Sequence, residues 1–386
     1  MASINLQGDT SGSISISAPS VAGSNTLTLP ATTQTLATQN ALGVRNLIIN
    51  GDMRIDQRNA GSAITAGGFM VDRWQNFQSQ SSKWTSIQQV TDAPTGATHS
   101  VKYTSASAYT VGAADYFTHE QKIEGNIAAH LGWGASGAKT VTLSFYVKSS
   151  LTGTFGGAFY AGSGSYGYPF EYTIDAANTW EKKTITIEGP TSGTFNTDNS
   201  ASFTVCFGLG IGTDYSWTAG SWQAQVVRSA TGATSVVGTS GATWQVSLAQ
   251  LEVGDTATPF EHRPWDDELI RCMRYYEKCI NYSTVEPAGG YTGVEWTDIP
   301  RDKPANYAIK DVKYKVRKRA SATVNFWSLN QTVNQFGNVY TGVDLGNAGA
   351  IWGSEQGFTW RNETGGTISA SSNNGLAVLW AASSEL

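Results

Sequence analysis

Short stretches in which polar and apolar residues strictly alternate recur along this chain, and they constrain its fold more than any other feature. Successive side chains of a β-strand point to opposite faces, so strict alternation predicts a strand with one buried face. Glycine-rich turns separate these stretches, and no longer repeat of the kind that builds solenoids or propellers is visible. We therefore expect antiparallel sheets that pack as a β-sandwich or jelly roll. The clearest stretches are 141–147, 184–188, 202–207 and 243–248.

The composition supports a folded β protein and excludes some classes of binding partner. Charged residues make up only 14% of the chain and aromatic residues 11%, which argues against disorder. The net charge of −5 disfavours nucleic acid, because duplex binding usually needs a basic surface. No apolar run approaches the roughly 20 residues of a membrane helix, so we expect no membrane insertion. Three widely spaced cysteines and no secretion signal indicate reduced thiols from cytoplasmic synthesis: Cys206, Cys272 and Cys279.

Residues 1–44 are nearly uncharged and form a segment of their own. Within it, 13–17 and 26–29 alternate as two short strands, which are too few to enclose a core. The segment therefore either completes its core with other copies of the chain or a docking partner, or it is a loose N-terminal tail. Residues 45–265 follow as one large antiparallel β domain.

One helix is predicted after this domain, linking it to a second one. Acidic residues at 266–268 suit the start of a helix and basic residues at 271–278 suit its end, so we place the linking helix at 266–282. Its apolar stripe either lies between three subunits or packs on the chain's own sandwich. Residues 283–386 alternate again and predict a smaller, sandwich-like C-terminal β domain. The stripe consists of Leu269, Met273, Tyr276 and Ile280.

Four groups of stretches carry a more specific signal. They are 11–19 with 26–30, 46–58 with 72–74, 249–254 with 258–263 and 268–278, and 316–320 with 380–386. Together they resemble bacteriophage tail-fibre and related virion-appendage proteins. The first is similar to an N-terminal segment common in phage fibres. The second and third look like the opening and the close of a fibre jelly roll related to carbohydrate-binding modules.

This resemblance implies a non-enzymatic virion protein, usually a homotrimer, that is assembled in the cytoplasm of a bacterial host. Residues 1–44 would attach it to other tail or baseplate proteins. Its receptor would be a host surface polysaccharide or lipopolysaccharide. Two alternatives stay open at this point: a structural head-fibre, capsid-decoration or tail protein without a receptor role, and a tail spike that cleaves glycans.

Signatures of catalysis are weak. Residues 162–167 match a dinucleotide-binding pattern by letter, but no helix follows to receive a pyrophosphate. The four scattered histidines do not make a zinc set. Asp52 and Asp56 are the closest carboxylate pair outside the helix, yet they lie among arginines, so ion pairs explain them better than glycoside cleavage. We expect no catalytic residue, no metal and no cofactor.

Two glycine-rich loops carry unusually many aromatic residues. Sugars stack their C–H faces on aromatic rings and need a few fixed polar partners for their hydroxyls. Because loops run over the surface, we expect some of these rings to be exposed for binding. The alternative is that they pack over the ends of the sandwich or into a trimer interface. The candidate sugar-binding residues are Tyr166, Tyr168, Asp214, Tyr215, Trp217 and Trp222, with Glu171 as a further acceptor.

A second candidate surface lies in the C-terminal domain. Four basic residues alternate on one face of a predicted strand and would meet an anionic polysaccharide or lipopolysaccharide phosphate. The alternatives are a solvated outer face and ion pairs between subunits. The four are Lys313, Lys315, Arg317 and Arg319. Three tryptophans either line a pocket at the tip of this domain or belong to its core: Trp327, Trp352 and Trp360.

Overall fold

The chain consists of two compact units, Met1–Gly43 and Val44–Leu386, each held together mainly by contacts within itself. The computed structural model describes residues 3–7, 11–17, 45–287, 289–298, 309–362 and 375–386.

The described part of the first unit is an antiparallel hairpin of β1 (Ser3–Gln7) and β2 (Ser13–Ser17). Its register sets Ile4 opposite Ile16 and Leu6 opposite Ile14. β2 is the strand predicted at 13–17. The strand predicted at 26–29 lies outside the described residues.

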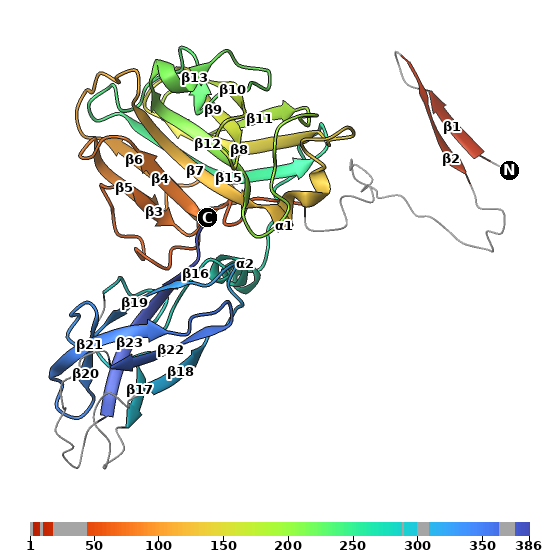
Figure 1. Ribbon diagram of the computed structural model, residues 1–386. Helices are drawn as coiled ribbons and strands as arrows, with labels where there is room; N and C mark the ends of the chain where they lie inside the picture. The colour runs from red at the N-terminus through yellow and green to blue at the C-terminus, as the bar shows by residue number, and fades with distance from the viewer. Residues whose placement is uncertain (1–2, 8–10, 18–44, 288, 299–308, 363–374) are drawn as a thin grey trace. The chain divides into compact units, whose positions relative to one another are not determined.

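Two antiparallel sheets of the second unit pack face to face as a β-sandwich of the jelly-roll class (Figure 1). Of the residues that the structure describes, 43% lie in strands and 6% in helices, so the prediction of a mainly β fold is confirmed. The six-stranded sheet has the order β10-β9-β12-β7-β4-β3, and the five-stranded sheet the order β11-β8-β15-β6-β5. The bounds are β3 (Gly68–Val71), β4 (Trp74–Gln78), β5 (Trp84–Val90), β6 (Ser100–Ser105), β7 (Tyr116–Glu124), β8 (Val141–Ser149), β9 (Gly153–Ala161), β10 (Gly167–Ile174), β11 (Glu181–Ile187), β12 (Ala201–Ile211) and β15 (Thr243–Val253).

Each of the four clearest alternating stretches of the sequence forms a strand of this sandwich: β8, β11, β12 and β15. Short elements connect the strands. After β7 come α1 (Gly125–Ala128) and η2 (Ala129–Leu131), and between β12 and β15 lie η3 (Thr213–Tyr215), β13 (Ser216–Trp217) and β14 (Ser229–Ala230). β13 and β14 pair in parallel as a small separate sheet.

Alternate residues of the central strands fill the space between the two sheets. In β12, Phe203 and Phe207 are fully buried in one apolar cluster that draws on both sheets, whereas Cys206 points the other way and its Sγ donates to the Arg228 carbonyl. Trp74 stacks on His119 with ring centroids 4.5 Å apart. Because His119 is completely buried, desolvation lowers its pKa to about 3 and the ring is neutral at pH 7.

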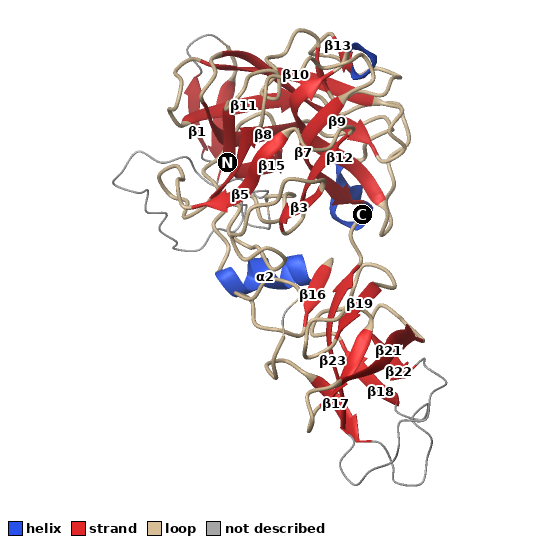
Figure 2. Cartoon of the chain, turned by 90° about the vertical axis from the view of Figure 1, so that its left-hand side faces the viewer, coloured by secondary structure: helices blue, strands red, loops and turns tan. Residues whose placement is uncertain are grey.

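The linking helix is shorter than the sequence predicts. α2 (Trp265–Met273) opens with three acidic residues in its first turn, as expected, but it ends at Met273 rather than at residue 282 (Figure 2). The chain then forms β16 (Tyr276–Lys278), whose residues pair with Ala381, Ala382 and Ser383 near the far end of the sequence. In this pairing the backbone N–H and C=O groups of β16 form hydrogen bonds with β23. In a continuing helix the same groups would bond to residues four positions away in the sequence.

The C-terminal sheet is built around β23, which pairs with several other strands. Along β23, Val378 and Trp380 face one apolar cluster and Leu379 and Ala381 face another, so both faces of the strand are buried. This explains why its sequence is a continuous apolar run rather than an alternating one. The remaining bounds are β17 (Glu295–Asp298), β18 (Ile309–Lys313), β19 (Thr323–Trp327), β20 (Gln335–Asn338), β21 (Asp344–Ile351), β22 (Gly357–Asn362) and β23 (Gly375–Ser383).

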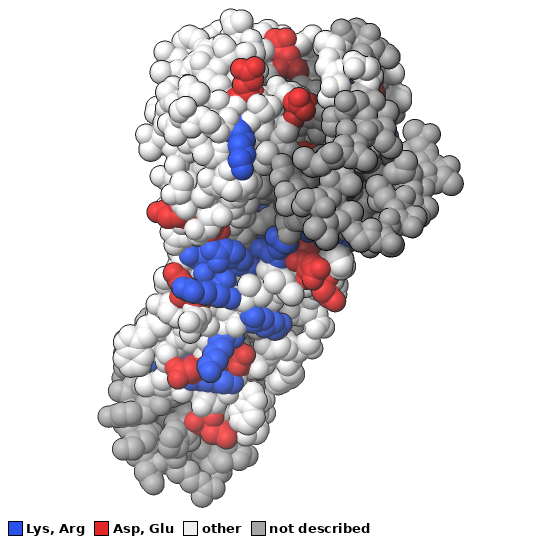
Figure 3. Space-filling model, turned by 90° about the vertical axis from the view of Figure 1, so that its right-hand side faces the viewer, with Lys and Arg blue, Asp and Glu red and all other residues white. Residues whose placement is uncertain are grey.

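Charged side chains join the C-terminal sheet to the sandwich. Glu124, at the end of β7, has a fully buried carboxylate that accepts hydrogen bonds from Arg274 at 2.5 and 3.0 Å and from the Tyr275 hydroxyl at 2.5 Å. The Glu385 carboxylate, beyond β23, pairs with Arg58 and Arg73 of the sandwich. On the surface of the second unit, Lys and Arg side chains gather beside Asp and Glu side chains in one region (Figure 3).

A buried lysine lies in the same region. The Lys318 ammonium is fully buried, lies 2.6 Å from the Glu277 carboxylate, and also donates to the carbonyls of Met273 and Val316 at 2.5 and 3.1 Å. All three ammonium hydrogens are thereby satisfied, which is the condition under which a buried ion pair is tolerated.

We expect Lys318→Ala to lower the free energy of unfolding by about 3–5 kcal/mol, because it leaves the Glu277 carboxylate buried without a counter-charge. Urea unfolding at pH 7 measures this. Lys313→Ala, at an exposed position of the same region, is the control and should change stability by no more than about 0.5 kcal/mol. Equal losses for the two variants would contradict the assigned role of Lys318.

A partly buried acid, Glu286, gives this region a pH dependence. The Tyr276 hydroxyl donates to the Glu286 carboxylate, and the Arg58 guanidinium lies 3.7 Å over the Tyr276 ring. Burial raises the pKa of Glu286 to about 7, and the nearby Arg58 only partly opposes this. The protonated acid therefore stabilises the folded state below pH 4.5, and this contribution disappears as the pH rises through about 7.

We expect Glu286→Gln to flatten the fall of stability between pH 5 and pH 8 by an amount on the order of 1–2 kcal/mol relative to the unsubstituted chain. Urea unfolding of both proteins at several pH values measures the difference. Comparing the two proteins cancels the opposite contribution of buried His119, which loses stability as the pH falls below 6.5. Parallel pH profiles would show that Glu286 does not titrate between folded and unfolded states as described.

Candidate functional site

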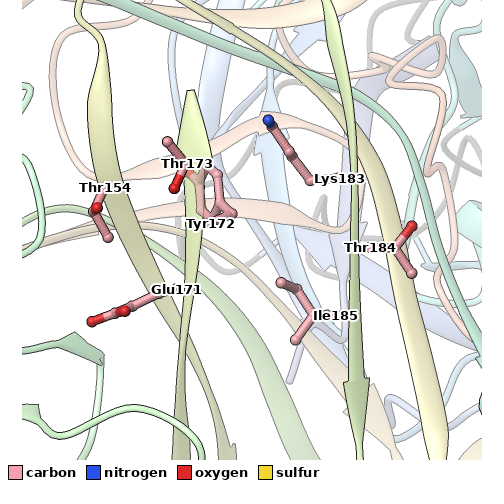
Figure 4. Close-up of a pocket in the computed structure, with 7 residues that line it drawn as sticks. All are labelled: Thr154, Glu171, Tyr172, Thr173, Lys183, Thr184 and Ile185. Atoms are coloured by element: carbon pink, nitrogen blue, oxygen red, sulfur yellow. The ribbon is translucent and has the colours of Figure 1, made fainter. Parts of the chain in front are cut away.

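One hollow of about 320 Å³ opens between the edge strands β10 and β11 of the sandwich (Figure 4). Its lining is mostly polar, with hydroxyls of three threonines and one carboxylate, that of Glu171. The ammonium of Lys183 is already paired with Glu181 at 2.6 Å and with Asp175 at 3.3 Å. The hollow therefore lacks the pair of carboxylates that glycoside cleavage needs. The lining residues are Thr154, Glu171, Tyr172, Thr173, Lys183, Thr184 and Ile185.

Three of the predicted sugar-binding rings meet beside this edge. Tyr166 and Trp222 stack almost parallel, with ring centroids 5.5 Å apart and an angle of 7°, and Tyr168 meets Trp222 edge-on at 5.5 Å. A pair of backbone hydrogen bonds between Gly167 and Gln223, 2.9 and 2.8 Å long, brings the two glycine-rich loops together. The structure thus assembles one ring cluster from two loops about 55 residues apart, a separation seen directly in the sequence.

The cluster is supported from below. The Trp222 ring also contacts Trp133 and Phe195 edge-on, at 5.4 and 5.9 Å, and its Nε1 donates to the Glu188 carbonyl at 2.8 Å. With other rings around it, Trp222 supports the cluster rather than presenting a free face. All three rings are partly exposed, but Tyr166 and Tyr168 have fewer ring neighbours than Trp222 and are therefore better placed to contact a ligand.

Polar groups lie around the two tyrosines. The Tyr166 hydroxyl lies 3.0 Å from the Ser192 hydroxyl, and the exposed hydroxyls of Ser163 and Ser165 lie 3.2 Å from each other in the loop before Tyr166. Gly193 has a positive φ of 94°, and a Cβ there would lie 2.7 Å from the Tyr166 ring. Glycine at this position therefore lets the loop pass beneath the ring.

The other three predicted residues lie elsewhere. Asp214 is exposed in η3, where its backbone N–H donates to the Ala113 carbonyl. Tyr215 contacts the Tyr116 ring, with centroids 5.5 Å apart. Trp217 lies in β13, and its indole N–H is buried without an acceptor. The six residues therefore do not form a single site, and no contact brings Asp214 to the described ring cluster.

An arginine that the sequence reasoning did not single out organises the region around Tyr215. The Arg228 guanidinium lies 4.5 to 5.7 Å from the centroids of four aromatic rings, and its Nη1 lies 3.2 Å from the Tyr160 hydroxyl. That hydroxyl donates to the buried Glu120 carboxylate at 3.0 Å. Arg228 therefore covers part of the outer face of the six-stranded sheet. The four rings are those of Phe77, Tyr116, Tyr160 and Tyr215.

The predicted basic stripe is only partly a surface. Its strand ends at Lys313, and the Arg319 guanidinium donates to three main-chain carbonyls, at 2.8 to 3.0 Å, instead of facing solvent. Arg317 pairs with Glu355. Lys313 and Lys315 remain exposed. Arg317 is exposed as well as paired. The expectation of four basic residues on one strand face was wrong, because β18 ends at Lys313 and main-chain carbonyls hold the Arg319 guanidinium.

The remaining predicted residues are mostly packing residues. Of the helical stripe, Met273, Tyr276 and Ile280 are buried inside this chain, and Leu269 packs partly buried beside Cys272 and Tyr275. Tyr276 and Ile280 pack against Trp327 and Leu379 of the C-terminal sheet, and not on the sandwich as one of the two expectations had it. Trp327 and Trp360 are core residues, whereas Trp352 is 77% exposed.

Asp52 and Asp56 hold structure, as the sequence indicated. Asp52 lies 2.9 Å from Arg54, and Asp56 accepts hydrogen bonds from the backbone N–H groups of Asn59 and Gly61. In the part of the chain that the structure describes, no group of three or more histidine, cysteine or acidic residues is arranged to hold a metal ion. The same part contains no helix long and apolar enough to cross a membrane.

Neither a scan against protein-family models nor a search of curated proteins gave a match. Three similar solved structures are the enzymatically active domain of tailspike protein 4 of bacteriophage CBA120, TmCBM61 in complex with β-1,4-galactotriose, and the family 11 carbohydrate-binding module of a Clostridium thermocellum cellulosomal cellulase. Their identities are 12%, 10% and 14%, and their TM-scores 0.31, 0.29 and 0.25. The matches cover 54%, 54% and 51% of this chain, but 21%, 99% and 99% of the other chains. At TM-scores this low, the similarities carry no argument about what this chain binds.

We expect Gly193→Ala to displace the Tyr166 ring, because the new methyl group would overlap it and the positive φ disfavours alanine. The free energy of unfolding should fall by about 2–3 kcal/mol, and the near-ultraviolet circular dichroism of the ring cluster should change. Gly164→Ala is the matched control, since Gly164 has a φ of 75° and an open space where the Cβ would lie. Only the backbone strain of about 1 kcal/mol should appear in that variant. An unchanged dichroism signal in Gly193→Ala would contradict the described contact.

Proposed function

We propose that this chain is a bacteriophage virion protein, without enzymatic activity, that attaches the virion to a bacterial surface by binding glycans. The observation that carries the proposal is the Tyr166–Tyr168–Trp222 ring cluster at the edge of the sandwich. The partly exposed rings of Tyr166 and Tyr168 offer apolar surface for the C–H groups of a sugar, and the surrounding serine hydroxyls offer partners for its hydroxyls.

The virion assignment is supported by the resemblance of the sequence to phage tail-fibre proteins. In this proposal residues 1–44 attach the chain to tail or baseplate proteins, and the two-stranded β1–β2 hairpin, too small to enclose a core, is completed by two further copies in a homotrimer. Three copies per fibre would turn weak single sites into strong attachment, because each bound site holds the others near the surface. The chain would be assembled in the host cytoplasm.

A structural virion protein without a receptor role is the second candidate. It is favoured by the enclosure of Trp222 between other rings, which is what a packing cluster needs as much as a binding one. A glycan-cleaving tail spike is less well supported, because the described hollow at β10 and β11 contains a single carboxylate.

The test is binding of the fluorescently labelled full chain to a panel of bacterial strains, with and without periodate oxidation of their surface glycans. Binding that periodate abolishes supports a glycan adhesin. Absence of binding by a folded oligomer to every strain, or binding indifferent to periodate, would favour the structural role.

We expect Tyr166→Ala together with Tyr168→Ala to weaken periodate-sensitive binding about tenfold or more, since each ring contact contributes about 0.5–1.5 kcal/mol beyond its buried area. Cell-binding curves measure the change. Trp352→Ala removes an exposed ring outside the site and should leave binding unchanged. Equal binding by both variants would remove the ring cluster from the proposal.

A further inference from the structure

Three exposed aromatic rings lie on one face of the C-terminal sheet, where the sequence reasoning placed none. They are Tyr291, which is 63% exposed, Trp296 on β17, 47% exposed, and Tyr340 after β20, 55% exposed. The Tyr291 hydroxyl donates to the Val339 carbonyl at 3.3 Å, next to Tyr340, so these two residues are neighbours although 49 positions apart in the sequence. Large exposed rings that gather in this way usually mark an interaction surface.

Strand register shows that Trp296 shares this face. Trp296 and Asp298 alternate on β17, and they stand opposite Ala377 and Gly375 of β23. Tyr340 lies over the same row, because a Cβ on Gly375 would be 3.1 Å from the Tyr340 ring. The Tyr340 hydroxyl also lies 3.5 Å from the Asp298 carboxylate.

The floor beneath the rings is made of very small residues. On the other side of β23, β20 places Gly337 opposite Ala377, so one row runs from Trp296 through Ala377 to Gly337. A Cβ on Gly337 would lie 3.6 Å from the Asp344 carboxylate. Asp344 therefore lies at the end of this row opposite Trp296. Asp298 lies beside the row, next to Tyr340. We refer to Tyr291, Trp296, Asp298, Tyr340 and Asp344 as the aromatic patch.

The chemistry of the aromatic patch selects its ligand. Exposed rings suit the C–H face of a pyranose, and carboxylates are strong acceptors for sugar hydroxyls. The Asp344 oxygens already accept hydrogen bonds from Asn330 and Thr332, so Asp298 is the carboxylate better placed to accept one from a sugar. The same two carboxylates disfavour an acidic ligand, and Lys310, which donates to the Trp296 carbonyl, is already paired with Glu295 at 2.7 Å. A neutral glycan therefore fits better than a uronic acid polymer or a phosphorylated one.

A protein partner fits less well on grounds of area. Three rings that are each about half exposed offer on the order of 300 Å² together. A stable protein interface buries roughly 800 Å² on each partner. Sugar-binding surfaces need only a few rings and polar groups, which is what the aromatic patch contains.

We infer that the aromatic patch is a second glycan-binding site, in the C-terminal domain, which takes neutral saccharides. The inference rests on the proposed glycan-binding function and adds a site and a ligand class to it. Each chain would then carry two separate sites, one on the edge of the sandwich and one on the C-terminal sheet.

The experiment is binding of the labelled full chain to a glycan array that carries neutral hexose and N-acetylhexosamine oligosaccharides beside oligosaccharides with uronic acids. Trp296→Ala together with Tyr340→Ala should lose the signal of one set of neutral glycans about tenfold or more. Asp298→Asn should weaken the same set. Trp352→Ala, an exposed ring just beyond the opposite end of β21 from Asp344, is the matched control and should keep it.

Each result decides the inference. Equal binding of all neutral glycans by the control and the Trp296/Tyr340 variant overturns it, as does the absence of any glycan signal, or a loss confined to uronic acids. Loss of self-association in sedimentation, with glycan binding intact, would assign the patch to a second copy of the chain instead. Urea unfolding of each variant, with Trp296→Phe as a ring-preserving substitution that should retain binding, separates a lost contact from a lost fold.

The same array separates failure of this inference from failure of the proposed function. Loss of neutral glycans in the Tyr166/Tyr168 variant alone supports the sandwich site and overturns the second site. Loss in the Trp296/Tyr340 variant alone supports the inferred site and removes the sandwich cluster from the proposal.

Discussion

The hydrogen-bonded ion pair of Glu124 with Arg274 and Tyr275 is the interaction on which the arrangement of the second unit depends. Glu124 ends the central strand β7, and its carboxylate is completely buried, so it needs donors from outside the strand. Arg274 and Tyr275 supply them directly after α2 and directly before β16. One buried carboxylate thus sets where the helix must stop and where the pairing with β23 begins.

The sandwich could be predicted from the sequence because each of its strands is recognisable from a few neighbouring residues. In β8 and β12 every second residue faces one core, so alternation alone identifies the strands. The helix was overextended for the opposite reason. Tyr276 and Ile280 fit a helical stripe, but their burial depends on β23, about 100 residues further along the chain. The periodicity of the sequence around the helix does not indicate that a distant strand will pair there.

The candidate sites show the same division between local and long-range information. Composition identified Tyr166 and Trp222 as ring-bearing loop residues, but only the Gly167–Gln223 bridge makes them neighbours. The aromatic patch left no local signal, since Tyr291 and Trp296 come from one segment and Tyr340 from another, more than 40 residues further along the chain. The basic stripe is the opposite case, because the local sequence pattern predicted it but the structure does not form it. The Arg319 guanidinium donates to carbonyls of residues far away in the sequence.

The two proposed sites differ in how much order they have before a ligand arrives. The Tyr166 cluster is braced by Trp222, whose ring and N–H are both engaged, so little side-chain freedom remains to be lost on binding. Trp296 and Tyr340 are about half exposed and have fewer supports. A preordered site and a more flexible one on the same chain would suit attachment to a variable surface. The Tyr166 cluster would set the affinity for one glycan. The aromatic patch would add avidity wherever a neutral sugar lies within reach.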